Sequence, residues 1–120
     1  MNNIEAILND LNALPSVLGC ALVTGDGIMV CSAMRGRIAD DVVAGLASFL
    51  IATTRKTLEE CGFGSFSRFV MNSTHGKVVL TDLGESFLVV VADQFAGLEG
   101  ILPEIQDAAR RVRRAAQISM

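Results

Sequence analysis

The chain has 120 residues, of which 51% are apolar and 19% charged, and its formal net charge is −3. That length suffices for one domain with a hydrophobic core, and the high apolar content excludes an intrinsically disordered chain. The negative charge disfavours nucleic acid as a partner, and no run of about 20 apolar residues predicts a membrane span. We expect a cytoplasmic protein, because the first residues lack the basic start of a signal peptide, and we expect apolar surface that a partner covers.

The first part of the chain predicts a helix followed by a β-hairpin. Apolar residues at helical spacing form one stripe that ends before Pro15: Ile4, Ile7, Leu8, Leu11 and Leu14. Two short apolar runs, 20–24 and 28–32, are then separated by Gly25-Asp26-Gly27. Glycines supply the positive φ angles of a tight reversal, so we interpret this segment as a hairpin turn; a phosphate-binding loop would lead into a helix.

A long second helix is predicted from Ala39 to Cys61, with no charge on two opposite faces before Arg55. At 100° per residue, one face carries mostly large apolar side chains and is assigned to the protein's own sheet: Val42, Val43, Leu46, Phe49, Leu50 and Thr53. The other face is the main interface candidate, because its small residues let another helix approach closely: Ala44, Ala47, Ser48 and Ile51, continued by Arg55.

The second half predicts three strands, over 65–72, 77–82 and 87–92, and a last helix that starts at Leu98. Short connections make the three strands an antiparallel meander. The strand over 87–92 is apolar on both faces, which places it in the centre of a sheet covered on both sides. The strand over 65–72 mixes polar and apolar residues, which is typical of an edge strand that can pair with another chain.

No arrangement of residues in this sequence indicates catalysis. His75 is the one histidine, and it lies in an expected surface turn, where it cannot form a metal site by itself. Cys20, Cys31 and Cys61 lack the spacing of a metal site or a redox pair, so we expect buried, reduced thiols. We therefore predict a protein that is not an enzyme and that holds no metal and no cofactor.

Arginines gather at two places. Half of them lie on the polar face of the last helix: Arg110, Arg111, Arg113 and Arg114. A solvated helix end, favoured by the helix dipole, is the plain interpretation, and an acidic partner or a lipid surface is the alternative. Arg35 and Arg37 flank Gly36 in a predicted loop, where they are possible partner contacts if they are not simply solvated.

Two segments of the sequence resemble one known family. The stretch from Leu14 to Gly19 (LPSVLG), followed by Ala21 to Ile28 (ALVTGDGI), resembles the opening signature of the Roadblock family, the dynein light chain relatives. The stretch Val90-Val91-Ala92-Asp93, followed by Gly97-Leu98, resembles the last strand of that family and the entry to its last helix. The predicted αββαβββα order extends this resemblance over essentially the whole chain as a single domain.

The resemblance implies an α+β sandwich with a profilin-like five-stranded antiparallel sheet in the order 2-1-5-4-3, helices one and three on one face and helix two on the other. It also implies a homodimer, in which the edge strand pairs with its copy and the second helices lie side by side as a platform for a Ras-like small GTPase. The predicted dimer or partner interface is Ala44, Ala47, Ser48, Ile51, Arg55, Phe66, Arg68 and Val70.

The leading hypothesis is therefore a non-enzymatic dimeric regulator of a small GTPase, which stimulates hydrolysis by repositioning the GTPase's own groups. Two alternatives remain open. One is a structural or motor-adaptor module that only dimerises, and the other is a small-ligand sensor, since related layered folds hold ligands.

Overall fold

The computed structural model describes residues 3–36 and 38–118, with three helices and five strands in this part of the chain. Their order is the predicted αββαβββα: α1 (Asn3–Asn12), β1 (Val17–Thr24), β2 (Met29–Met34), α2 (Asp40–Cys61), β3 (Arg68–Asn72), β4 (Gly76–Asp82), β5 (Ser86–Asp93) and α3 (Leu98–Ile118). The expected strand over 65–72 is shorter than predicted, because regular pairing with β4 begins at Arg68.

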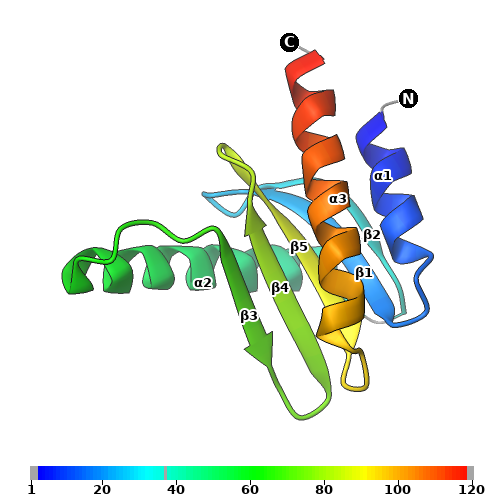
Figure 1. Cartoon of the computed structure of the whole chain (residues 1–120), viewed down its shortest axis with the longest axis horizontal. Coiled ribbons are helices and arrows are strands. Elements are labelled where there is room, and N and C mark those ends of the chain that lie inside the picture. Colours follow the sequence, from blue (N-terminus) through cyan, green and yellow to red (C-terminus); the bar gives the residue numbers. More distant parts are fainter. Residues whose placement is uncertain (1–2, 37, 119–120) are drawn as a thin grey trace.

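The strands form one antiparallel sheet in the order β2-β1-β5-β4-β3, as the resemblance implied (Figure 1). β5 is central and is buried on both faces, which confirms the expectation drawn from its continuous apolar run. β3 is an edge strand, which its mixture of polar and apolar residues also predicted.

Two separate cores lie on the two faces of the sheet. α1 and α3 cover one face, where their buried residues pack on inward side chains such as Val17, Cys20 and Val90. α2 covers the other face and packs on Val23, Phe87 and Val89. Figure 1 shows α2 running across the strands on the side opposite α1 and α3, so the sandwich has the two-sided layering expected of the family.

The prediction of which face of α2 meets the sheet is wrong, although Val43, which was assigned to the core, is buried there. Ile51, assigned to an outside interface, has 0% of its surface exposed and belongs to the core against β1, β4 and β5. Leu46, assigned to the core, is exposed. The physical reason is spacing: Ala44 and Ala47 let the helix axis come close to the sheet, and a face of larger side chains would hold it further away.

The turn between β1 and β2 explains part of this close packing. Gly27 has φ +91°, and a Cβ atom placed there would lie 2.8 Å from the Cβ atom of Ser48. That is closer than two carbon atoms can pack, so the hairpin turn accepts no side chain beside α2. The glycine required by the turn is also the glycine that lets α2 lie flat on the sheet.

We expect Gly27→Ala to lower the free energy of unfolding by about 2–3 kcal/mol, from the left-handed backbone and the clash together. Gly84→Ala is the matched control, because Gly84 has φ +104° with open space around it. It therefore carries the backbone cost alone, about 1 kcal/mol. Urea unfolding followed by circular dichroism measures both, and equal losses would show that the contact with Ser48 contributes nothing.

Candidate partner-binding surface

α2 presents a row of large apolar side chains to the outside. Val42 is 65% exposed, Leu46 39% and Phe49 66%, and their spacing of four and three residues places them on one face of the helix. We call these three residues the α2 outer face. Exposed apolar side chains gathered in this way on a helix are typical of a surface that another protein covers. A second uncharged face was predicted and exists, but it is the opposite one.

The edge strand β3 lies beside this helix. Its register with β4 is regular from Arg68 to Asn72, and the other side of β3 pairs with no strand in the described part of the chain. Figure 1 shows the C-terminal half of α2 continuing past β3, so the helix overhangs the open edge of the sheet. Phe63, in the connection between α2 and β3, is also exposed. An open strand edge and a projecting helix therefore occur on the same side of the molecule.

Most of the helix residues predicted as an interface are not on the surface. Ala44, Ala47 and Ile51 are buried in the core under the sheet, and Ser48 is half-buried beside the turn at Gly27. They cannot contact a partner while α2 stays packed on the sheet. Sequence reasoning missed the α2 outer face as a surface. The row of large apolar residues was visible in the sequence but was interpreted as core.

Arg55 and Phe66 form the rim of the α2 core. The Arg55 guanidinium lies 5.0 Å above the centre of the Phe87 ring, and the Phe66 ring stacks on Phe87 with centroids 5.8 Å apart. A guanidinium at this distance is attracted by the negative face of the aromatic ring. Both predicted interface residues therefore have a partner within their own chain, on the central strand β5.

Arg68 and Val70 lie on β3, at the open edge where they were predicted. Val70 is 37% exposed, and the Nε atom of Arg68 is buried without a hydrogen-bond partner among the described residues. A buried donor that lacks an acceptor costs free energy until something supplies one. The edge thus combines a half-covered apolar side chain with an unsatisfied polar group.

Of the two loop arginines predicted as possible partner contacts, only Arg35 lies within the described residues. Arg35 is exposed, and its guanidinium donates a hydrogen bond to the carbonyl oxygen of Asn12 at the end of α1. Its known contact is therefore to its own chain on the α1 side of the sheet. Arg37, the second possible partner contact, lies outside the described residues.

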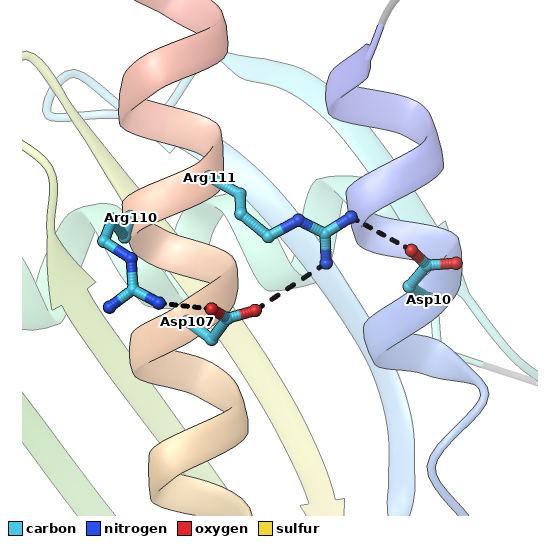
Figure 2. A network of polar contacts seen from close by, with 4 residues as sticks. All are labelled: Asp10, Asp107, Arg110 and Arg111. Atoms are coloured by element: carbon cyan, nitrogen blue, oxygen red, sulfur yellow. Dashed lines mark hydrogen bonds and ion pairs between the residues drawn. The ribbon is translucent and has the colours of Figure 1, made fainter.

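The α3 arginines Arg110, Arg111 and Arg113 make polar contacts within the chain. Figure 2 shows Arg111 between two carboxylates, 3.1 Å from Asp10 of α1 and 3.8 Å from Asp107 of α3, while Arg110 pairs with Asp107. All these side chains are well exposed, so each pair contributes at most about 1 kcal/mol. Arg113 donates to the Asp82 carbonyl oxygen at 3.3 Å. This cluster helps to hold α1 on α3.

One cavity of the structure bears on the small-ligand hypothesis. A cavity of about 330 Å³ lies between α3 and the β4–β5 turn, lined mainly by apolar residues such as Leu22 and Val112 with Arg113 beside them. Residues 3–36 and 38–118 contain no group of three or more His, Cys, Asp or Glu that could hold a metal ion. In the same ranges, no helix combines the length and the apolar character needed to span a bilayer.

The three thiols are free but differ in burial. Cys20 is buried and donates to the carbonyl oxygen of Leu8 at 3.2 Å, Cys31 is half-buried, and Cys61 is exposed. The expectation of three buried thiols is wrong for Cys61, because the end of α2 projects past the sheet. Burial raises the pKa of the Cys20 thiol from 9.0 to about 12, and it also raises the pKa of Cys31.

These raised pKa values predict a loss of stability in alkali. Above pH 9 the unfolded chain releases the Cys20 proton while the folded chain keeps it until about pH 12. The contribution of the protonated Cys20 thiol to the free energy of unfolding is therefore complete below pH 9. It is lost as pH rises toward 12, at up to about 1.4 kcal/mol per pH unit. The sequence has no tyrosine to titrate in this window. Urea unfolding at pH 8 and pH 10.5 measures the slope, and Cys20→Ala should flatten it; a slope unchanged by Cys20→Ala would contradict this assignment.

Comparison with known proteins identifies the class of fold first. The profilin-like sandwich is shared with profilin II of Acanthamoeba castellanii, which is 11% identical, with a TM-score of 0.66 over 92% of this chain and 97% of that one. The chain matches the Roadblock/LC7 domain family over residues 3–92, and it belongs to that family.

Individual relatives have low sequence identity. The uncharacterized protein MJ1340 of Methanocaldococcus jannaschii is 28% identical over 110 residues, covering 92% of this chain and 96% of that protein. The structure of Myxococcus xanthus MglB is 20% identical, with a TM-score of 0.87 over 95% of this chain and 94% of that one. Another structure, described as MglB with tetrameric arrangement, is 18% identical, with a TM-score of 0.87 over 98% of this chain and 90% of that one. These likenesses show the fold.

Proposed function

We propose that this protein is a non-enzymatic, homodimeric regulator that binds a Ras-like small GTPase. The observation that carries the proposal is the α2 outer face, whose large apolar side chains the described part of the chain leaves exposed. Membership of the Roadblock/LC7 family supports the kind of partner, since the resemblance in sequence implied a GTPase platform. A solved MglB structure described as tetrameric supports self-association in relatives.

The two edges of the sheet support β3 as the strand that pairs between copies. On the opposite edge, the register slips between Leu22 and Val23, which leaves Val30 of β2 as a bulged, exposed residue. Bulges discourage pairing with a further strand, and β3 has no such irregularity. An antiparallel pair of β3 strands places both α2 helices on the same side of the joined sheet. The two outer faces then form one apolar platform.

Binding alone suffices for such a regulator. Hydrolysis by a small GTPase depends on groups that position water and stabilise charge around its own nucleotide. A dimer that holds those groups in place accelerates the reaction. A motor adaptor would share the dimer but would not distinguish nucleotide states, and a ligand sensor would use the cavity beside α3.

Calorimetric titration tests the proposal. Each purified Ras-like GTPase of the source organism is loaded with a non-hydrolysable GTP analogue or with GDP and titrated with the wild-type protein. We expect binding in one nucleotide state, weakened about 30-fold or more by Phe49→Glu because a buried aromatic anchor is replaced by a charge. Phe95→Glu is the matched control, since Phe95 is 85% exposed and lies before α3, outside the α2 outer face.

Binding that survives Phe49→Glu would remove the α2 outer face from the GTPase interface. Absence of binding in either nucleotide state, with the dimer intact, would favour the adaptor hypothesis.

A further inference from the structure

The hydrogen bonds between β3 and β4 determine which backbone groups point toward the open edge. Ser73 N donates to Gly76 O at 2.8 Å, and Asp82 N donates to Ser67 O at 3.0 Å, so both ends of the ladder are hydrogen-bonded pairs. Bonded and non-bonded pairs alternate along an antiparallel ladder. The residues whose N–H and C=O groups point away from β4 are therefore Arg68, Val70 and Asn72.

The same residues share one face of the sheet. Val70 lies opposite Val79, which belongs to the core under α1 and α3, so the side chain of Val70 is on that face. Arg68 and Asn72, two residues away on either side, are on it as well. Thr81, opposite Arg68, has a buried hydroxyl that lacks a hydrogen-bond partner among the described residues, as does Arg68 Nε.

We propose that two copies of this chain pair antiparallel through β3 with Val70 on the two-fold axis. This inference rests on the dimer of the proposed function and specifies its register. Val70 then faces Val70 of the second copy, and Arg68 faces Asn72. Each of the three outward-pointing residues meets another outward-pointing residue, so every free N–H and C=O group of β3 is paired.

Other registers satisfy fewer groups. A shift of one residue places outward-pointing groups against inward-pointing ones, and no ladder forms. A shift of two residues leaves one outward-pointing residue of each copy without a partner. The proposed register also brings the Asn72 amide oxygen of one copy next to Arg68 of the other, as an acceptor for the unsatisfied Nε atom, and it covers the exposed part of Val70.

Cysteine cross-linking in the full-length protein reads out the register, with Cys61→Ser as the background because Cys61 is exposed. Facing residues of a hydrogen-bonded pair have Cα atoms about 5.5 Å apart, within disulfide range. Under mild oxidation, Val70→Cys should form a covalent dimer. Arg68→Cys and Asn72→Cys should each stay uncross-linked alone, because each residue lies about 13 Å from its own copy. An equimolar mixture of these two variants should form the mixed disulfide.

Three other outcomes would contradict the proposal. Stronger cross-linking of Arg68→Cys or Asn72→Cys alone than of Val70→Cys would show a shifted register. Dimers that resist cross-linking at all three positions would remove β3 from the interface while leaving the dimer. A single-chain mass for the background protein would instead refute the dimer of the proposed function, so the two failures are distinguishable.

A charge exchange tests the polar pair by a second route. Arg68→Glu should weaken the dimer about tenfold, because the pair occurs twice across the axis. Adding Asn72→Arg to Arg68→Glu should restore affinity, since opposite charges then face each other in this register. A double variant as weak as Arg68→Glu alone would contradict the pairing of these positions.

Discussion

Replacing Ile51 by glutamate should leave the protein unfolded at room temperature. The side chain has 0% exposure and packs in the core between α2 and the sheet. Burying a carboxylate there without a partner costs several kcal/mol, and losing the burial of isoleucine costs about 2 kcal/mol more. Together these approach the whole stability of a small domain, about 5–15 kcal/mol. Far-ultraviolet circular dichroism should show loss of the native spectrum.

Ile51→Val is the matched control, because it removes one methylene and should cost only about 1 kcal/mol with the native spectrum retained. A folded Ile51→Glu variant with a native urea midpoint would show that this face of α2 is not core, and the orientation of the helix on the sheet would be wrong.

Replacing Leu46 by glutamate should have the opposite consequence. Leu46 is on the α2 outer face, where a carboxylate reaches water, and glutamate is a good helix former, so the isolated chain keeps its fold. In the proposed dimer, the two α2 helices lie side by side and Leu46, the least exposed residue of the outer face, is taken to lie where they touch, so a carboxylate enters this contact from both copies. We expect the dimer to weaken about 100-fold or more, corresponding to about 2.7 kcal/mol. Sedimentation velocity across a dilution series measures the dissociation constant.

Val30→Glu controls for adding a negative charge at an exposed aliphatic residue, since Val30 is the bulged residue on the far edge of the sheet. It should dimerise like the wild type. A Leu46→Glu variant that is as dimeric as Val30→Glu would exclude the α2 outer face from self-association.

The sequence predicted those features of the fold that a local pattern encodes. The run 87–92 is apolar at every position, and β5 is buried on both sides in the centre of the sheet. The polar residues of 65–72 marked an edge, and β3 is one. Gly25-Asp26-Gly27 predicted a tight turn between β1 and β2, which the structure has. For the two strands the side-chain pattern reflects the water or protein on each side, and for the turn Gly27 reflects the positive φ angle that it requires.

The site was harder to predict because α2 carries no charge from Val42 to Thr54, on either face. Size was the remaining criterion, and it favoured Leu46 and Phe49 as core. The close packing of α2 on the sheet also depends on a contact distant in sequence, the approach of Ser48 to Gly27, which a pattern within the helix cannot show. The link from Arg111 to Asp10 is likewise beyond any local pattern.

Light scattering coupled to size-exclusion chromatography tests the central claim most directly, because the proposed function places a second copy of the chain on the open β3 edge. At tens of micromolar protein, we predict a mass twice the 12.7 kDa of one chain. A mass of 12.7 kDa under the same conditions would contradict the account, since the β3 edge would then remain open in water without a second copy.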